Sequence, residues 1–454
     1  MPKKKTALTI EERLQQALVP AEEQPYEVPE NWVWVYGKNI LMPMESKKPD
    51  GEDFYYIDID AIDNKNQVVT EAKKIKTAQA PSRASRKLHT GDTVFSLVRP
   101  YLKNIAYIDE QLSECIASTG FFVCTPNATL NDKYLYRLMV SSYVVDGLNK
   151  YMKGDNSPSI RKDDIENYPF PLPPLSEQQR IVERIEELFA KLDEAKERLQ
   201  EAADSFAVRK AAILHKAFTG ELTKQWRRKN GVSDESWEEK KLGEVGSWLG
   251  GGTPSTSREE YWENGNILWI TSKDMKSAVI EDTLMKVNEI GVKNSSANYI
   301  EKPALLVVMR SGILRRTFPV AMVKKPFTVN QDLKAIIPDK DDLEFLYWML
   351  LSNEQRILDT CMKNGTTVES INSNALKNLT FKCPTLPEQH EIVRLIDDLL
   401  ARERAAQQAA EQALASIDLM KKSILARAFR GELGTNKASE ASALELLRQV
   451  LAEN

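Results

Sequence analysis

The hexapeptide Pro173-Pro174-Leu175-Ser176-Glu177-Gln178 returns later in the chain as Pro384-Thr385-Leu386-Pro387-Glu388-Gln389. The step between them is 211 positions, from 177 to 388, and it continues downstream without a gap. Ala217-Phe218-Thr219-Gly220-Glu221-Leu222 meets Ala428-Phe429-Arg430-Gly431-Glu432-Leu433 at the same step. An apolar pattern typical of a long helix lies between the two motifs in each half, which indicates an internal duplication with one such helix per copy.

Apolar residues in both helical stretches recur at alternating steps of three and four, as in a coiled coil. Large residues prevail in the first stretch and small ones in the second, so we predict that the helices pack against each other. A generic dimerisation helix is the plainer alternative, but exact repetition with two different modules attached favours a spacer. The predicted seam residues are Ile181, Ile185, Leu188, Leu192, Leu199 and Phe206 in the first helix, and Ile392, Ile396, Leu399, Ala406, Ala410 and Ile417 in the second.

The ends of these helices are also marked in the sequence. Ser176 with Gln179, and Thr385 with Glu388, predict capping boxes, while Gly220 and Gly431 predict the stops. At 1.5 Å per residue each helix would be roughly 65 Å long.

The pattern along the chain predicts an α+β protein with two mixed α/β modules and two long antiparallel helices, arranged as a pseudo-twofold repeat. Short β-like runs such as Thr93-Val94-Phe95-Ser96-Leu97-Val98 alternate with turns in the first module. The predicted segments are an N-terminal helical extension (1–24), a first module (25–170), a first long helix (171–222), a basic linker (223–234), a second module (235–382), a second long helix (383–434) and a C-terminal helix (435–454).

Composition favours a cytoplasmic protein of several domains. The 454 residues are enough for two cores of about 150 residues and connecting helices. The four cysteines contain no CxxC pair and the three histidines stand alone, so neither a zinc site nor a disulfide framework is expected. The sequence has no apolar run long enough for a membrane helix, and no apolar core follows the basic residues 3–5 as a signal peptide would require.

The first module carries a basic run that contains no acidic residue. Lysine and arginine alternate there with small hydroxyl side chains, a composition that suits contact with nucleic-acid phosphates. A solvated loop would explain the same run about as well. The candidate DNA-binding residues of this module are Lys73, Lys74, Lys76, Arg83, Arg86, Lys87, Arg99 and Lys103.

The second module carries an arginine cluster, a pair of amides suited to adenine and a glycine-rich stretch at 250–255. Glycines there could let the backbone approach a phosphate, but the Gly-Lys-Ser/Thr ending of a nucleotide-binding P-loop is absent, and a plain loop is the simpler explanation. The candidates are Gly251, Gly252, Thr253, Ser255, Lys273, Arg310, Arg315, Arg316, Asn330 and Gln331.

Over nearly its whole length the chain resembles the specificity subunit of type I restriction-modification systems. The repeated helix motifs carry this resemblance together with Pro81-Ser82-Arg83-Ala84, Gly91-Asp92 and Arg99-Pro100 in the first module, and Gly251-Gly252-Thr253-Pro254-Ser255, Tyr261-Trp262-Glu263-Asn264-Gly265 and Trp269-Ile270 in the second. The resemblance implies two target recognition domains that each read half of a split double-stranded DNA site. It also implies that the conserved helices hold these domains apart and dock two modification subunits.

The resemblance further implies that this chain is a recognition subunit and not an enzyme. S-adenosylmethionine, ATP and magnesium would then be bound by the modification and restriction subunits, and this chain would bind no cofactor or metal. Pro173-Pro174-Leu175 lacks the flanking residues of the methyltransferase loop that holds a flipped base. Pro49-Asp50 with Glu71-Ala72-Lys73 formally matches a nuclease motif, but the match is short and has no counterpart at the 211 step. A purely structural coiled-coil adaptor is a third possibility, but it would predict repeats that match throughout.

Overall fold

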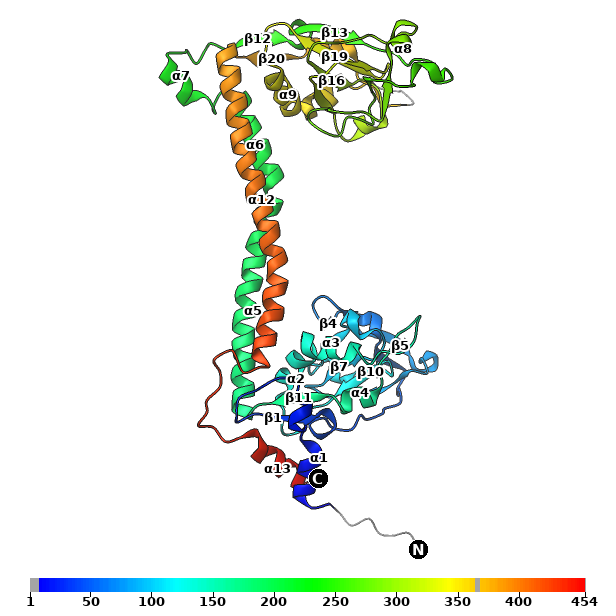
Figure 1. Ribbon diagram of the computed structural model, residues 1–454, viewed down its shortest axis with the longest axis vertical. Helices are drawn as coiled ribbons and strands as arrows, with labels where there is room; N and C mark the ends of the chain where they lie inside the picture. The colour runs from blue at the N-terminus through cyan, green and yellow to red at the C-terminus, as the bar shows by residue number, and fades with distance from the viewer. Residues whose placement is uncertain (1–7, 364–367, 454) are drawn as a thin grey trace. The chain divides into compact units, whose positions relative to one another are not determined.

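The computed structural model describes residues 8–363 and 368–453. These residues fall into two compact units, one formed by the chain up to residue 200 together with the chain from residue 412, and one formed by residues 201–411. Residues 1–7 of the predicted N-terminal extension lie outside the described part. Each unit combines sheets, short helices and part of a long helix, so the predicted α+β class is confirmed (Figure 1).

Short strands pair in small sheets in the first module. β1 (Val33–Tyr36) and β11 (Pro169–Leu172) are antiparallel, so the beginning and the end of the module meet beside the long helix. The predicted strand at 93–98 is β7 (Thr93–Ser96), which is fully buried. The other strands form the sheets β10-β7-β8 and β5-β2-β9-β6 and the pair β3-β4; their bounds are Phe121–Cys124 (β10), Ile105–Tyr107 (β8), Lys73–Lys76 (β5), Asp53–Ile57 (β2), Ile116–Ser118 (β9), Ala84–Lys87 (β6), Ile62–Asp63 (β3) and Val68–Val69 (β4).

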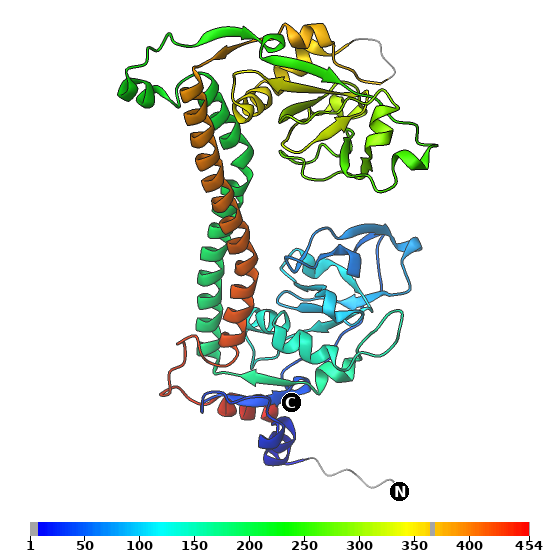
Figure 2. The same cartoon turned by 45° about the horizontal axis from the view of Figure 1, so that its top comes forward.

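Both ends of the chain contribute to the first unit. α1 (Ile10–Ala17) begins at Thr9, which forms the predicted capping box with Glu12. α13 (Ala443–Glu453) packs beside α1 (Figures 1 and 2), where Arg13 donates a hydrogen bond to the carbonyl of Leu451 at 3.1 Å. The other short helices of this unit are α2 (Asp132–Met139), α3 (Ser142–Asn149) and α4 (Lys162–Glu166).

The second module repeats the attachment to the helix and, like the first, contains a four-stranded sheet. β12 (Glu238–Lys241) pairs with β20 (Thr380–Cys383), as β1 pairs with β11. The antiparallel main sheet has the order β13-β19-β16-β17, and a smaller sheet has the order β15-β14-β18. The bounds are Gly246–Gly250 (β13), Leu333–Pro338 (β19), Ala304–Val308 (β16), Val320–Val323 (β17), Met285–Val287 (β15), Ile267–Ile270 (β14), Phe327–Val329 (β18), Glu289–Lys293 (α8), Leu343–Ser352 (α9), Glu354–Cys361 (α10) and Ser373–Lys377 (α11).

One-turn 3-10 helices connect many of these elements. They are η1 (Ala21–Glu23), η2 (Gly37–Asn39), η3 (Ile59–Ala61), η4 (Thr77–Gln79), η5 (Pro100–Leu102) and η6 (Leu112–Glu114) in the first unit, and η7 (Leu242–Glu244), η8 (Glu259–Tyr261) and η9 (Gly312–Arg315) in the second.

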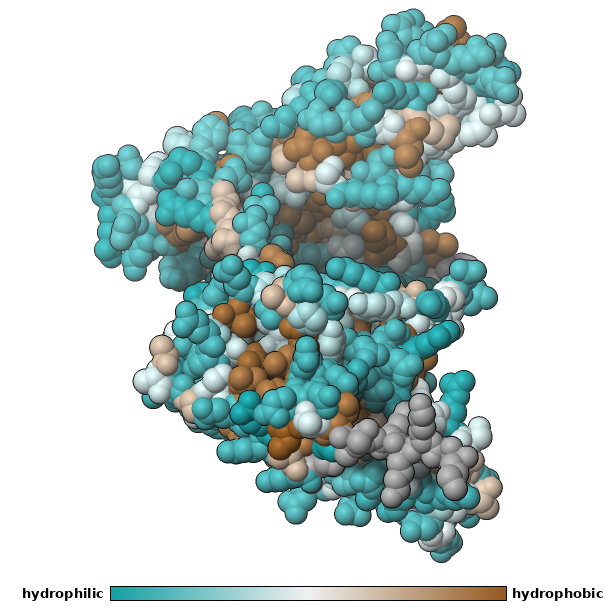
Figure 3. All heavy atoms as spheres, turned by 60° about the horizontal axis from the view of Figure 1, so that its bottom comes forward, coloured by the Kyte–Doolittle hydropathy of each residue, from teal (hydrophilic) through white to brown (hydrophobic). Residues whose placement is uncertain are grey.

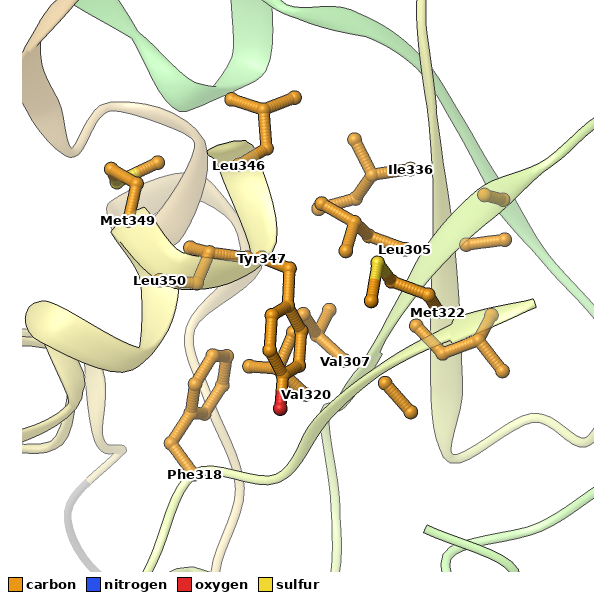
Figure 4. Close-up of a cluster of buried hydrophobic side chains, with 14 of the residues drawn as sticks. Leu305, Val307, Phe318, Val320, Met322, Ile336, Leu346, Tyr347, Met349 and Leu350 are labelled. Atoms are coloured by element: carbon orange, nitrogen blue, oxygen red, sulfur yellow. The ribbon is translucent and has the colours of Figure 1, made fainter. Parts of the chain in front are cut away.

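Helix α9 joins the main sheet of the second module to a long helix. Its side chains Leu346, Tyr347 and Leu350 lie against apolar residues of β16, β17 and β19 (Figure 4). On α9 the buried Phe345 ring also meets Phe218 of the long-helix stretch, with ring centroids 5.5 Å apart. The sheet and the long helix therefore share one continuous core, which fixes the module on its support.

The long helical stretches are antiparallel within each unit. The first stretch consists of α5 (Leu175–Asp204) and α6 (Phe206–Phe218), which are separated at Ser205, and the second is the continuous α12 (Leu386–Ala428). In the first unit Lys421 pairs with Asp193 at 2.5 Å. In the second unit Arg209 of α6 pairs with Glu403 of α12 at 2.5 Å.

Burial along the helices agrees with the predicted seam except at one position. Of the predicted residues, Ile181, Ile185, Ile392, Ile396, Ala410 and Ile417 are buried, and Leu188, Leu192, Leu199, Phe206 and Leu399 are partly buried. Ala406 is exposed, while Leu400 is buried. The prediction for Ala406 was wrong because the seam continues from Leu400 through Glu403 and Gln407 to Ala410, which keeps the steps of three and four but leaves Ala406 on the exposed side.

The repeated Glu-Gln pair attaches each module to its long helix. Gln178 accepts a hydrogen bond from the backbone N–H of Asn131, the residue that caps α2, at 2.7 Å. Gln389 accepts one from the N–H of Asp342, which caps α9, at 2.8 Å. Asn131 and Asp342 are themselves 211 positions apart, so the duplicated motif makes the same buried contact in both units.

The glutamates of the same motif bind the segment that follows the opposite helix. Glu177 accepts hydrogen bonds from Trp32 and Asn436, both at 2.7 Å. Glu388 accepts from Thr223 and Arg227, also both at 2.7 Å.

Two sequence predictions about these ends were wrong. Ser176 lies inside α5, because the helix begins one residue earlier, and Glu388 turns to Arg227 and does not form a capping box with Thr385. The predicted basic linker contains a helix, α7 (Lys224–Asn230), whose Arg227 is buried. Gly220 and Gly431 do follow the helix ends, with positive φ angles of 79° and 75° as predicted for such stops.

Candidate nucleic-acid interface

Acidic side chains partly neutralise the basic run of the first module. Lys73 pairs with Asp58 at 2.6 Å, Lys74 with Asp53 at 3.2 Å, and Lys87 with Glu45 at 2.6 Å. These acids precede the run in sequence, on or beside β2 and in the segment before it. They therefore lie outside the acid-free run that the sequence shows. All three pairs remain largely exposed to solvent.

Other cations of the run have no carboxylate partner within the part of the chain that is described. Lys76 and Arg83 are exposed, and Arg86 is half-buried with no partner for its Nε atom. The structure brings Arg83 and Arg99 to one cleft of about 740 Å³, which Asp58, Asn104 and Ser118 also line. Of the candidate residues of the first module, this cleft therefore brings together Arg83 and Arg99.

Arg99 and Lys103 flank the turn η5 in an unusual conformation. Both have left-handed backbones, with φ of 47° and 58°, which non-glycine residues adopt rarely and which often marks functional sites. Arg99 donates to the carbonyl of Asn156 at 2.8 Å. The pKa of Lys103 is lowered by burial and by the nearby Lys422, with Asp146 opposing the shift.

Part of the candidate set of the second module is joined by hydrogen bonds around residues 330–332. Thr253 donates to the side chain of Gln331 at 2.8 Å, while Asn330 and Arg310 both contact Asp332, at 3.4 Å and 2.8 Å. Arg315 pairs with Glu369, and within the described chain Arg316 has no ion-pair partner. Lys273 is exposed in the turn that follows β14.

The glycines of the 250–255 stretch are explained by packing within the protein. A Cβ on Gly251 would come within 1.9 Å of the carbonyl oxygen of Val329, and one on Gly252 within 2.0 Å of Ser296 Oγ. Ser255 Oγ lies 2.8 Å from Ser257 Oγ. The loop therefore needs glycine to approach its own module, and its polar groups lie beside Gln331.

Several cationic residues that the sequence analysis did not single out also reach the surface. Lys65 lies between β3 and β4, and Lys196 and Lys422 lie on the long helices, where the charge pattern resembles that of any solvated helix. Lys224, Arg228 and Lys229 are exposed on α7. The side of the molecule seen in Figure 3 is mainly hydrophilic, with separated hydrophobic patches.

One residue of the nuclease-like motif is engaged in an ion pair. Lys73 of the nuclease-like motif pairs with Asp58, and among residues 8–363 and 368–453 no group of three or more His, Cys, Asp or Glu could hold a metal ion. Nor is any described helix long and apolar enough to cross a membrane.

The two modules attach to the long helices in the same way, but their charged surfaces differ. The chain is therefore a duplicated protein with two modules. A family profile described as the type I restriction modification DNA specificity domain matches residues 38–203 and again 234–413. The chain belongs to this family. It is accordingly of the recognition type and not one of the catalytic components of such systems.

Individual relatives agree with this assignment. The chain is 37% identical over 196 residues to the EcoR124I/EcoR124II specificity subunit of Escherichia coli, an alignment that covers 41% of this chain and 48% of that relative. It is 26% identical over 353 residues to the E. coli EcoDI specificity subunit, covering 71% of this chain and 77% of the relative. The crystal structure of the HsdS subunit from Thermoanaerobacter tengcongensis superposes with a TM-score of 0.70 at 26% identity, covering 90% of this chain and all of that one.

Proposed function

We propose that this chain binds double-stranded DNA at a target with two separated parts, one read by each module. The main support for the proposal is that the two copies of the repeat share buried contacts but differ at their surfaces. The buried Gln178 and Gln389 contacts are the same in both units, whereas the exposed polar groups of the modules differ. Shared attachment with different surfaces is what two different half-sites require, because phosphate contacts set position and side chains at base edges set sequence.

The long helices serve as the spacer and as the docking site for two modification subunits, with restriction subunits joining the same complex. Methyl transfer from S-adenosylmethionine and ATP-dependent cleavage with magnesium take place on those subunits. The EcoR124I and EcoDI relatives are named as specificity subunits of type I restriction enzymes, which supports this division of roles.

The proposal is tested by sequencing methylated adenines in cells that express this chain with its modification subunit. A two-part site with an unread gap is expected, and replacing residues 25–170 by the corresponding module of a relative should change one half-site alone. The purified chain should neither cleave nor methylate DNA. Cleavage by the chain alone that Asp50→Ala or Lys73→Ala abolishes would instead establish the nuclease alternative.

A further inference from the structure

A groove lies between the first module and the long helices of the same unit. It consists of two adjoining hollows of about 850 Å³ and about 660 Å³. The turn between β3 and β4 forms one wall, and α5 and the last part of α12 form the other. The residues that line both hollows include Lys65, Arg137, Phe189, Lys196, Asp418 and Lys421.

Phe189 lines both hollows of this groove, and two cations lie over its ring. The guanidinium of Arg137 lies 5.1 Å from the centre of the ring and the ammonium of Lys421 lies 5.0 Å from it. Arg137 also pairs with Glu186 at 2.6 Å, and Lys421 with Asp193 at 2.5 Å. Both cations are thus already compensated by acids of α5.

The remaining cations of the groove are not compensated. Lys65, Lys103, Lys133, Lys196 and Lys422 have no carboxylate within 4 Å in the part of the chain that the structure describes. Lys103 is half-buried in a left-handed turn and lies close enough to Lys422 for their charges to repel. Holding two like charges together is unfavourable unless an anion joins them.

The acidic groups of the groove are too few to supply that anion. Asp109 is engaged by the backbone N–H of Leu112 at 2.9 Å, and Asp418 lines both hollows without an ion pair in the described chain. Asp146 lies near Lys103 and is exposed.

We propose that Lys103 and Lys422 bind a phosphate of the DNA backbone within the unread gap, next to the half-site of the first module. This inference rests on the proposed DNA-binding function and extends it to a contact that involves both a module and a helix. Lysine suits the role because it is a mobile point charge that contacts phosphate without reading sequence. Asn66 and Gln67 at the rim keep the groove polar, as a wet DNA interface requires.

The internal repeat favours DNA over an acidic segment of a partner protein. The positions 211 residues away from Lys103 and Lys422 are Leu314, which is buried, and Ala211. The lysine pair is therefore present in the first unit alone. A subunit that docks twice would be expected to use features that both units share, whereas the gap in the DNA is present once.

The test uses the full chain in complex with its modification subunits and a duplex that contains the methylated target. Lys103→Gln/Lys422→Gln is compared with Lys191→Gln/Arg198→Gln, which removes two exposed cations of α5 that pair with Glu187 and Glu194. Affinity is measured between 50 and 200 mM salt, together with a series of duplexes that each carry one uncharged methylphosphonate in the gap.

The groove variant should bind at least tenfold more weakly near 0.1 M salt, with a salt slope lower by about 0.9, because both lysines contact the same phosphate and each lost phosphate contact removes about 0.9. The methylated sequence should not change. One methylphosphonate position should weaken the wild-type complex and have no further effect on the variant.

An affinity and slope equal to those of the control variant would overturn the proposal. Loss of the modification subunits from the variant, with DNA binding by the remaining chain unchanged, would assign the groove to an acidic protein segment and would also overturn it. If the wild-type complex itself fails to select its methylated target, the proposed function fails and not the groove alone.

Discussion

One glutamate near the start of each long helix connects segments that are distant in sequence. Glu177 and Glu388 are fully buried, and each binds the segment that follows the opposite helix. The sequence repeat identified both residues, but their partners differ: Glu177 meets neutral donors and Glu388 meets Arg227. The repeat shows that glutamate is retained at both positions. It cannot show the partners of the two glutamates, because these partners are distant in sequence and differ from each other.

Removing the carboxylate of Glu388 should be strongly destabilising. Glu388→Ala removes the buried partner of the Arg227 guanidinium, which keeps its ion pair with Asp234, so we expect a loss of about 1.5–3 kcal/mol in unfolding free energy. Urea denaturation measures this loss. Glu289→Ala, which breaks the exposed pair with Lys293, should change stability by no more than about 0.5 kcal/mol. Equal effects of the two substitutions would show that the Glu388 contact contributes nothing special.

Lys103 should reduce stability at neutral pH. Its pKa in the folded protein is below the ordinary value of 10.5, so the unfolded chain binds this proton more tightly and stability rises with pH between the two values. Lys103→Gln should therefore raise the melting temperature near pH 7, and the gain should vanish above about pH 10.5. Thermal melts at several pH values test this, with Lys191→Gln as the control. A lower melting temperature for Lys103→Gln would indicate that the lysine stabilises the turn.

At the level of elements, the sequence predicted the long helices and their glycine stops because apolar spacing and left-handed glycines are local properties. The break at Ser205 and the helix α7 were missed for different reasons. Ser205 donates to the carbonyl of Ala202 at 2.9 Å, a local contact that the apolar spacing does not register, whereas α7 is held by the buried Arg227, whose partner Glu388 is distant in sequence. Among the candidate site residues, the cationic positions were readable from composition. Their acidic partners were not, because Asp58 and Glu45 are 15 and 42 positions away from the lysines they bind.

The ion pairs change what is expected of the basic run. Arg83 has no carboxylate partner in the described chain, so Arg83→Ala should weaken DNA binding and lower the salt slope by about 0.9. The double variant Asp58→Ala/Lys73→Ala removes a neutral pair and should leave the slope unchanged. Titrations of the complex with target DNA at several salt concentrations measure both. A slope that falls equally in the two variants would mean that Lys73 leaves Asp58 to contact phosphate.

The molecule as a whole is organised by its duplication, but the copies do not end where the compact units end. The first unit needs residues from both ends of the chain, since Asn436 reaches Glu177 and α13 packs on α1. The second unit is continuous in sequence. The step of 211 predicted two modules and two helices, yet it could not predict that α12 is divided between the units, because periodicity within a helix says nothing about which module it supports.

If the paired helices set the gap between half-sites, lengthening both should lengthen the gap without changing the bases read. The points for insertion are the boundaries of the compact units, between Gln200 and Glu201 in α5 and between Glu411 and Gln412 in α12. Four residues add about one turn, roughly 6 Å, which corresponds to one or two base pairs at about 34 Å per 10 base pairs. Sequencing of methylated adenines should then show both original half-sites with a longer gap.

Insertion into α5 alone is the matched control, because it interrupts the seam without lengthening α12 and should mainly lower stability. Four residues do not preserve a seven-residue repeat, so the double insertion will also lose some stability, but the two helices stay equal in length and can pair again. An active double variant that kept the original gap and read different bases would show that the helices do not set the spacing. The modules would then fix the distance between half-sites themselves, and the long repeat would serve only to dock partner subunits.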